Sequence, residues 1–379
     1  MSGYRIPFNR PSLVGNELQY IAEAVRQGKL SGDGEFTRRC EAELEKTLSV
    51  RKVLLTTSCT HALEMAALLV EVGPGDEVIV PTFTFPSTAG AFALRGAEIR
   101  FADVRSDTLT LDETRLEQLV TARTRAIVPV HYAGVGCEMA TIGRVARRHG
   151  LAVVEDNAQG FLGKYRGRYL GTLGALATLS FHETKNVTCG EGGALLINED
   201  RFVERAEIVR EKGTDRKKFF RGQVEKYTWV DVGSSYIPSD ILAAFLLAQL
   251  EARERIQERR RELWHRYYRA LEGWAEQVGV RLPVVPPGCE QPYHMFFVIL
   301  PSAAARQVMI NRLGARGILA VFHYVPLHLS AMGKAHGGHV GDCPVAEELS
   351  ERLLRLPFYC SLEDGEQDEV IEAVTTCAW

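Results

Sequence analysis

Short apolar runs alternate with amphipathic stretches through the first half of the chain. The runs are KVLLTTS (52–58), EVIVPTF (77–83), EIRFADV (98–104), RAIVPVHY (125–132), LAVVEDN (151–157), LATLSFH (176–182) and GALLIN (193–198). Continuous Val, Ile and Leu residues of this length are typical of strands buried on both faces. Helical periodicity occupies residues 60–72, 112–122 (with Asp112 as N-cap) and 138–149. The pattern predicts βαβ units, hence an α/β fold with a mainly parallel sheet between helices.

The last two runs are separated by only about ten residues. A helical crossover between parallel strands needs more chain than this. We therefore expect one strand of this pair to be antiparallel, which makes the sheet mixed.

The pattern changes after residue 200. A helix over about 200–212 leads into a polar, aromatic-rich stretch at 213–236, which is too long for a routine connection and typical of a functional loop. Helices are then predicted over 239–251 and 251–274; the second alternates Glu and Arg, as a solvated helix does.

The remaining chain predicts a smaller α+β unit. Strand signals occur at 293–300 and 318–324 with a helix between them, and a further helix is expected at 344–355. We place the domain boundary near residue 250, giving a large domain over 1–250, which includes an N-terminal arm, and a small C-terminal domain over 251–379.

Composition excludes several classes of protein. The 45 basic and 48 acidic residues give a net charge of -3, without the basic excess that nucleic-acid binding needs. No signal-peptide pattern and no run of about 18 apolar residues occurs, so we expect a cytoplasmic, non-membrane protein. The eight cysteines form no C-x-x-C pair or Cys/His cluster, which argues against disulfides and a metal site.

Polar and aromatic side chains follow several of the predicted strands, where ligands collect in doubly wound sheets. Thr57–Thr60 opens a helix, Phe85 follows the second strand, Asp156 ends the fifth, and Lys185 follows the sixth in a glycine-flanked return. Each has an ordinary structural explanation: a helix cap, a core aromatic, a turn-capping acid and a solvated lysine. Together they supply an anion site, a stacking face, a carboxylate and an amine, which are the attachments of pyridoxal 5'-phosphate (PLP).

Four motifs in this order resemble the DegT/DnrJ/EryC1/StrS sugar aminotransferases, which are fold-type I PLP enzymes related to aspartate aminotransferase. They are TTSCT (56–60), PTFTFPST (81–88), VVEDNAQG (153–160) and SFHETKNVTCGEGG (180–193). The resemblance continues from IPFNRP (6–11) and KLSGDGEFT (29–37) to FHYVPLH (322–328) and RLLRLPFY (352–359), and so covers essentially the whole chain.

The resemblance implies a role for each matching residue. Lys185 would be the Schiff-base lysine and general base, and Asp156 would pair with the ring nitrogen. The remaining cofactor contacts would be Phe85 on the ring, Gln159 near the ring hydroxyl, and Ser58, Cys59, Thr60 and Ser180 at the phosphate. Related sugar dehydratases carry His at the position of Lys185, so the lysine favours an aminotransferase.

A narrower resemblance within the family, over residues 211–240, implies a substrate. It points to members that use L-glutamate to aminate C4 of dTDP-4-dehydro-6-deoxy-D-glucose, and the sequence leaves galacto and gluco products open. Many relatives carry G-x-N-x-R where this chain has Gly233, Ser235 and Ile237. Their Asn reaches the cofactor phosphate of the neighbouring subunit, so Ser235 either makes that contact with a hydroxyl or loses it.

The family forms homodimers with composite active sites, which implies that the 213–236 stretch crosses to a partner. Candidate substrate contacts there are Arg221, Lys226, Tyr227 and Trp229; candidates for the sugar pocket are His323, Tyr324 and His328. The alternative for the 213–236 stretch is a surface loop that packs on its own subunit. The alternative for the histidines is a purely structural role with satisfied hydrogen bonds.

Three other functions are the alternatives. A C3-keto nucleotide-sugar or cyclitol aminotransferase uses the same scaffold. A non-catalytic PLP-fold regulator would need an appended DNA-binding module, and no winged-helix pattern precedes the first strand. An NAD-linked sugar oxidoreductase is disfavoured because TTSCTHA follows the first strand in place of G-x-G-x-x-G.

Overall fold

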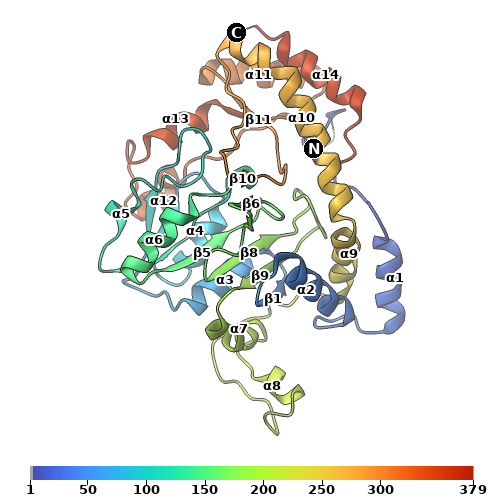
Figure 1. Ribbon diagram of the computed structural model, residues 1–379, viewed down its shortest axis with the longest axis vertical. Coiled ribbons are helices and arrows are strands. Elements are labelled where there is room, and N and C mark those ends of the chain that lie inside the picture. Colours follow the sequence, from blue (N-terminus) through green and yellow to red (C-terminus); the bar gives the residue numbers. More distant parts are fainter. Residues whose placement is uncertain (1–2, 379) are drawn as a thin grey trace.

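The computed structural model describes residues 3–378 and is built around a seven-stranded sheet (Figure 1). The strand order is β1-β9-β8-β5-β4-β2-β3. The strands are β1 (Lys52–Thr56), β2 (Glu77–Pro81), β3 (Glu98–Ala102), β4 (Thr124–Ile127), β5 (Ala152–Asp156), β8 (Leu176–Ser180) and β9 (Gly193–Ile197). β9 is antiparallel to both neighbours, whereas the other pairs are parallel. The seven predicted runs and the mixed character of the sheet are confirmed.

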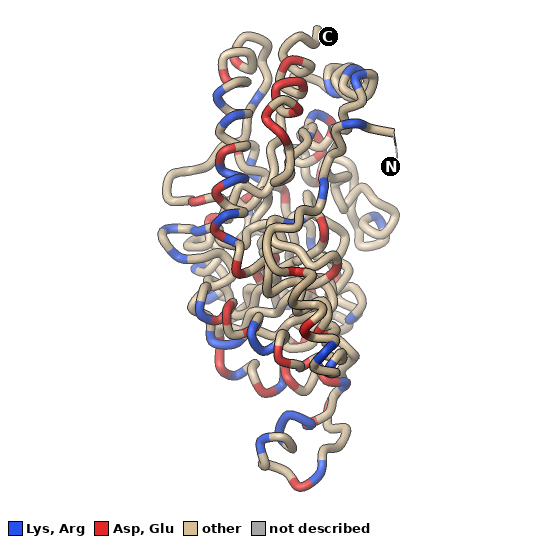
Figure 2. Tube along the Cα trace, turned by 90° about the vertical axis from the view of Figure 1, so that its right-hand side faces the viewer, with Lys and Arg blue, Asp and Glu red and all other residues tan. Residues whose placement is uncertain are grey.

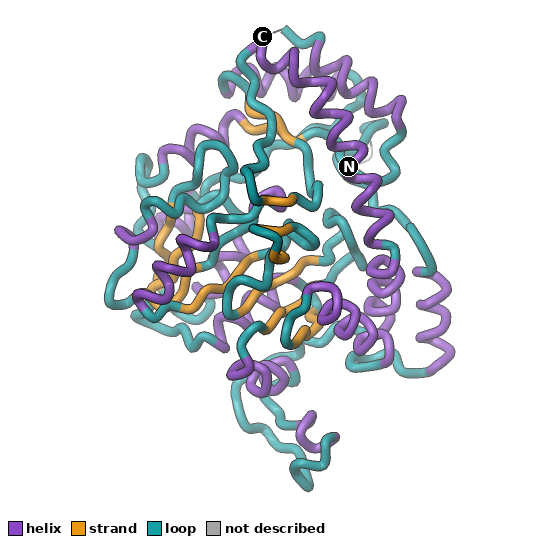
Figure 3. Tube along the Cα trace, in the orientation of Figure 1, coloured by secondary structure: helices purple, strands orange, loops and turns teal. Residues whose placement is uncertain are grey.

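Helices cover both faces of this sheet, with the strands between them (Figure 3). One face packs against α3 (Cys59–Leu69), α4 (Pro86–Ala93) and α7 (Val203–Arg210); the other packs against α2 (Glu35–Leu48), α6 (Met139–His149) and α9 (Asp240–Glu251), with α1 (Glu17–Gln27) against α9. Successive strand residues alternate between the faces. Leu54 packs into the core on one face of the sheet and Leu55 into the core on the other face. Because both faces are buried, the strands are continuous apolar runs in the sequence.

A second core lies towards the C-terminus. α10 (Arg253–Val278), α11 (Ala303–Ala315) and α14 (Asp364–Thr375) pack around an antiparallel pair of strands, β11 (Phe297–Ile299) and β12 (Leu353–Arg355). On α10, Ile256 joins the core of the large sheet, whereas Leu263 and the apolar residues after it join the second core. The domain boundary near residue 250 stays a prediction.

The strand predicted at 318–324 does not form. We expected a strand at 318–324, but Val321 makes only a single bridge, to Arg355. Beyond it the chain turns so that His323 and Tyr324 stack on each other, and Pro326 cannot donate to a ladder. The second strand is β12, which occupies the end of the helix predicted at 344–355; α13 (Pro344–Arg352) is the part that forms.

Two helices near the sheet also differ from expectation. The helix predicted over 112–122 shortens to α5 (Leu116–Leu119), because the Asp112 carboxylate accepts hydrogen bonds from the Thr114 backbone and hydroxyl and forms a local turn. α4 was not predicted; Pro86 stands in its first turn, where a missing N–H costs nothing.

The remaining elements are short. They are β6 (Lys164–Tyr165), β7 (Arg168–Tyr169), β10 (Cys289–Glu290), α8 (Arg216–Phe220) and α12 (Ala331–Ala335). Over residues 3–378, none of the helices has an apolar stretch long enough to cross a bilayer.

Residues 213–232, called the arm below, project away from the body of the molecule beyond α7 (Figure 1). Several large apolar side chains on the arm are exposed, among them Phe220, Tyr227 and Trp229. The exposed fraction of Trp229 is 79%. Figure 2 shows Lys and Arg gathered on this projection, while both signs of charge are interleaved over the rest of the chain.

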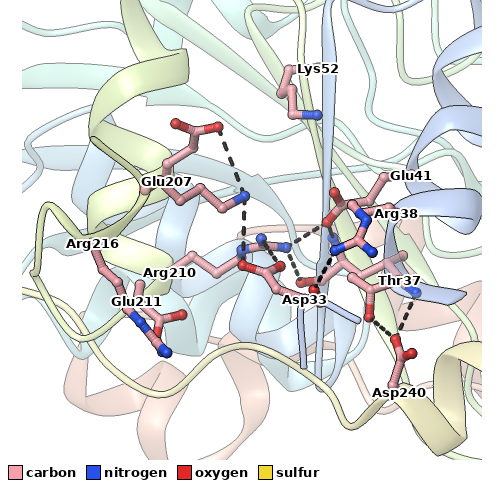
Figure 4. A network of polar contacts seen from close by, with 12 residues as sticks. Asp33, Thr37, Arg38, Glu41, Lys52, Glu207, Arg210, Glu211, Arg216 and Asp240 are labelled. Atoms are coloured by element: carbon pink, nitrogen blue, oxygen red, sulfur yellow. Dashed lines mark hydrogen bonds and ion pairs between the residues drawn. The ribbon is translucent and has the colours of Figure 1, made fainter. Parts of the chain in front are cut away.

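A buried ion-pair network lies where the arm leaves the body (Figure 4). The fully buried guanidinium of Arg210 donates to Glu41 Oε1 at 2.6 Å and to Asp33 Oδ1 at 2.5 Å. Glu41 also accepts from the backbone N–H of Leu55 at 3.1 Å. The network therefore ties the C-terminal end of β1 to α2 and α7, directly before the turn at Ser58.

Candidate active site

A cavity of about 540 Å³ opens at the carboxyl ends of β1, β5 and β8. This is the position expected for a ligand in a doubly wound sheet. Among its lining residues are ten of those singled out from the sequence: Ser58, Cys59, Thr60, Phe85, Asp156, Gln159, Ser180, Lys185, His323 and Tyr324. The fold thus brings the proposed cofactor contacts of four separate motifs into one pocket.

The turn between β1 and α3 places a helix N-terminus and several hydroxyls on one wall of the cavity. Ser58 is the N-cap of α3, where its Oγ accepts from the His61 N–H at 3.1 Å, and the Thr60 and Ser87 hydroxyls lie 2.7 Å apart. The first N–H groups of a helix lack intrahelical partners and favour anions. Gly193 lets β9 approach this turn, because a Cβ there would lie 2.4 Å from the Cys59 nitrogen.

Asp156 supplies a buried carboxylate at the end of β5. Only 5% of the residue is exposed. Oδ2 accepts from Thr88 Oγ1 at 2.7 Å, and Oδ1 accepts from the Ala158 N–H at 3.1 Å. Thr88 in turn lies 2.8 Å from the Thr84 hydroxyl. The carboxylate is thereby fixed in orientation without an ion-pair partner in the described chain.

Lys185 lies in the tight return between β8 and β9. The backbone N–H of Lys185 donates to the His182 carbonyl at 2.9 Å. The backbone N–H of Glu183 donates to the Gly190 carbonyl at 2.8 Å, and this bond closes the return. Burial lowers the pKa of the Lys185 amine, opposed in part by the charges of Cys59 and Asp156. A lowered pKa favours the neutral amine, the form that can act as nucleophile or base.

Phe85, Gln159 and Tyr324 form an adjoining wall. Phe85 is 57% exposed at the start of α4, and its ring centroid lies 6.3 Å from that of Tyr324. Gln159 donates from Nε2 to the Tyr324 hydroxyl at 3.2 Å and accepts at Oε1 from the Ala133 N–H at 2.7 Å. An exposed aromatic face at this position is available for stacking on a planar ligand.

The two histidines of FHYVPLH have different surroundings. His323 lines the cavity and hydrogen-bonds Tyr132 Oη through Nδ1 at 2.9 Å; burial holds its pKa well below the ordinary value. His328 does not line the cavity. It is fully buried, with Nδ1 at 2.6 Å from Thr82 Oγ1 and Nε2 at 2.9 Å from Glu347 Oε1. A pocket role for His328 is therefore not supported, and the alternative of a structurally satisfied histidine fits its surroundings.

The candidate residues of the arm lie away from the cavity of their own chain. Arg221 donates to Glu207 at 2.6 Å, whereas Lys226, Tyr227 and Trp229 are exposed. Ser235, just after the arm, is also exposed and pairs through its backbone with Glu211. None of these five lines the pocket, so their predicted contacts need a second subunit and stay predictions.

Sequence reasoning missed several polar residues of the pocket, among them His294 and Arg355. The Asn186 amide donates to the Pro292 carbonyl at 2.6 Å, so its oxygen faces Nδ1 of His294 at 2.9 Å. Nδ1 must therefore carry the proton. Arg355 stood in RLLRLPFY as a cation inside an apolar run, which is the signal that could have identified it.

The donor set suits PLP better than a metal ion. Within residues 3–378 no group of three or more His, Cys, Asp or Glu side chains could hold a metal. The cavity instead combines hydroxyls at a helix N-terminus, a buried carboxylate, an exposed aromatic face and an amine of lowered pKa. These are the groups that bind the phosphate, ring nitrogen, ring face and aldehyde of PLP.

Comparisons with known proteins agree with this donor set. The model of the DegT/DnrJ/EryC1/StrS aminotransferase family matches residues 11–375. The spore coat polysaccharide biosynthesis protein SpsC of Bacillus subtilis is 33% identical over 377 residues, which covers 97% of this chain and 96% of that protein.

Two solved structures are similar over almost their whole length. The aminotransferase TlmJ of Streptoalloteichus hindustanus superposes with a TM-score of 0.89 at 33% identity, covering 98% of both chains. Spr1654 of Streptococcus pneumoniae, solved in its PLP form, gives a TM-score of 0.90 at 26% identity, again covering 98% of both chains.

Proposed function

The chain belongs to the DegT/DnrJ/EryC1/StrS aminotransferase family, and from this premise we propose that it transfers the amino group of L-glutamate to C4 of dTDP-4-dehydro-6-deoxy-D-glucose. The chain is a PLP-dependent sugar aminotransferase with the fold-type I architecture. The identities of the donor, the nucleotide sugar and the aminated carbon are the proposed part.

One observation carries the proposed catalytic assignment: Lys185 and Asp156, from different motifs, line the same cavity beside a helix N-terminus. We assign the phosphate of PLP to Ser58, Cys59, Thr60 and Ser180, and the ring nitrogen to Asp156. Phe85 would cover the ring, Gln159 would lie near its hydroxyl, and Lys185 would hold the aldehyde end.

When bound, PLP supplies the electron sink that lets an amino group move between an amino acid and a carbonyl compound. Asp156 would face the ring nitrogen in a fixed orientation, because Thr88 Oγ1 and the Ala158 N–H both donate hydrogen bonds to its carboxylate. Lys185 is suited to take up and return a proton, because burial favours its neutral amine.

The C4-keto substrate is supported by the sequence of residues 211–240, which includes the arm. A sugar nucleotide presents a diphosphate and a thymine ring, and the arm carries exposed cations and aromatics that suit both groups. Because these side chains lie outside the cavity of their own chain, we propose a homodimer in which the arm of one subunit completes the site of the other. We propose the cytoplasm as its location.

Product analysis tests the substrate assignment. Purified holoenzyme is incubated with L-glutamate and either dTDP-4-dehydro-6-deoxyglucose or a 3-keto isomer, and the product is examined by NMR. We expect an amine at C4, and the ring coupling constants will distinguish the galacto from the gluco product. Amination of only the 3-keto sugar would favour the C3-keto alternative and refute the C4 assignment.

Borohydride reduction tests the cofactor attachment separately. We expect reduction to fix PLP to a single peptide that contains Lys185, and Lys185→Ala to retain the cofactor poorly and lose turnover. Lys212→Ala, at an exposed lysine of the loop after α7, is the matched control and should keep both. Turnover at the native rate in Lys185→Ala would disprove the assignment.

A further inference from the structure

His294 lines the cavity from a turn that α10 holds in place. Arg260, a buried residue of this helix, donates from Nε to the Tyr293 carbonyl at 2.9 Å and from Nη2 to the His294 carbonyl. Tyr293 has a φ of 52°, in the left-handed region that residues other than glycine adopt at a cost. Such a conformation persists where the surrounding contacts enforce it, so the fold itself sets the direction of the His294 side chain.

The Asn186 amide fixes the tautomer of His294. Its Nδ2 donates to the Pro292 carbonyl at 2.6 Å and to Gln257 Oε1 at 3.0 Å. Its Oδ1 must therefore face His294 Nδ1, which donates across 2.9 Å. Burial, and after it the positive charge of Lys185, holds the pKa of His294 well below its ordinary value. A neutral imidazole has a single N–H, so Nε2 of His294 is a hydrogen-bond acceptor.

This acceptor is open to the cavity. Nε2 of His294 makes no hydrogen bond within residues 3–378, although only 7% of the residue is exposed. Nε2 is not one of the enclosed side-chain atoms that lack a partner, so its lone pair is accessible from the cavity that the ring lines. His328, by comparison, bonds through both ring nitrogens. A ligand that carries an O–H or N–H group would complete the hydrogen bonding of His294.

The proposed reaction limits which ligand group can be this donor. L-Glutamate carries one donor group, the ammonium whose nitrogen is transferred. A 4-keto-6-deoxyhexose linked to dTDP carries hydroxyls on C2 and C3, and the C3 hydroxyl stands on the carbon next to the reacting carbonyl. Asn186, the partner of His294, directly follows Lys185, and both His294 and Lys185 line the same cavity. The hydroxyl beside the reacting carbonyl is therefore the donor that best fits the position of His294.

We propose that Nε2 of His294 accepts a hydrogen bond from the hydroxyl next to the reacting carbonyl of the sugar, an inference that rests on the proposed function and deepens it. The enzyme then selects an α-hydroxy ketone over a ketone with a methylene at that carbon. A methylene would leave Nε2 desolvated and without a partner, and a site built around a hydroxyl rejects the analogue that lacks it. His294 makes no corresponding contact with L-glutamate.

Two ligands that differ in one hydroxyl test this inference. dTDP-4-dehydro-6-deoxyglucose and its 3-deoxy analogue are titrated calorimetrically into the PLP form of the wild type, His294→Phe and His294→Gln. The PLP form holds no transferable amine, so binding is measured without turnover. We expect the wild type to prefer the 3-hydroxy sugar about 10- to 100-fold, and His294→Phe to reduce this preference to within about threefold. His294→Gln offers an amide oxygen near the position of Nε2 and should keep part of the preference.

Two controls separate this role from a general effect on the site. His149→Leu, at an exposed histidine of α6, should keep the wild-type preference. L-Glutamate has no hydroxyl, so its apparent Kd, measured from cofactor absorbance, should change less than about threefold in His294→Phe. Thermal unfolding identifies a variant that fails to fold, and His294→Leu then takes the place of His294→Phe.

The outcomes distinguish this inference from the proposed function. Equal weakening of both sugars in His294→Phe, or a matching loss of glutamate affinity, would overturn the inference and assign His294 to Lys185 or to the cofactor. Wild-type enzyme that binds both sugars equally well would refute the role of His294 alone. Wild-type enzyme that binds neither sugar would refute the proposed function and this inference with it.

Discussion

Thr88 donates a hydrogen bond from Oγ1 to Oδ2 of the buried Asp156 across 2.7 Å. The two residues lie on α4 and at the end of β5, 68 positions apart. Thr88→Val keeps the shape and removes the donor, so the carboxylate loses a charge-assisted hydrogen bond of about 1.5–3 kcal/mol. We expect kcat to fall about tenfold or more while PLP still binds. Thr108→Val, at a buried threonine paired with Thr110, is the control; equal effects would mean that only stability changed.

Gly193 should be intolerant of any side chain. A Cβ at this position would meet the backbone of Ser58 and Cys59 at 2.4 Å, so Gly193→Ala must push β9 away from the N-terminus of α3. We expect at least a tenfold loss of PLP affinity, measured by fluorescence titration of cofactor-free protein. Gly273→Ala, in open space on α10, should bind PLP normally and not lose stability.

The amine of Lys185 should titrate below the ordinary lysine value of 10.5, because burial lowers its pKa. At any pH beneath 10.5 a larger fraction of the Lys185 amine is then neutral, so in cofactor-free protein the pH midpoint for acylation of Lys185 should lie below 10.5. Peptide-resolved mass spectrometry over a pH series measures this. Asp156→Asn removes an opposing negative charge and should lower the Lys185 pKa further. A midpoint at or above 10.5 for Lys185 would contradict the prediction.

Arg210 should be important for stability. Arg210→Leu leaves Glu41 and Asp33 buried or half-buried without their cation, and we expect a loss of about 3–5 kcal/mol in the free energy of unfolding by urea. Changing Arg210 and Glu41 together to leucine should recover part of this loss. Arg51→Leu, which breaks an exposed pair with Asp200, is the control and should have little effect. A small effect of Arg210→Leu alone would contradict the assignment.

The proposed exchange of arms between subunits predicts complementation. Chains with Lys185→Ala and chains with both Tyr227→Ala and Trp229→Ala should each be poorly active. After mixing and subunit exchange, some heterodimers hold one site with an intact lysine and an intact arm, so activity should reappear. Activity that stays at the sum of the two inactive preparations, although mass spectrometry detects heterodimers, would exclude the shared site.

Sequence patterns determined the layered α/β architecture, because a strand buried on both faces must be a continuous apolar run and a ten-residue return cannot hold a crossover helix. They also identified Lys185, Asp156 and the turn at Ser58, because these polar groups directly follow such strands. The same local rules failed at 112–122 and 318–324. At 112–122 the side-chain turn of Asp112 overrode the helical propensity, and at 318–324 only Val321 forms a bridge to β12, with Pro326 following shortly after.

Only the tertiary structure decided which of the remaining polar residues face the pocket. His323 and His328 are five positions apart in one motif, yet one lines the cavity and the other is enclosed by Thr82 and Glu347. Arg355 lies 170 residues beyond Lys185 and shares its cavity without a counter-charge. Burial and pairing depend on what packs against a side chain from distant segments, and a linear pattern contains no measure of that.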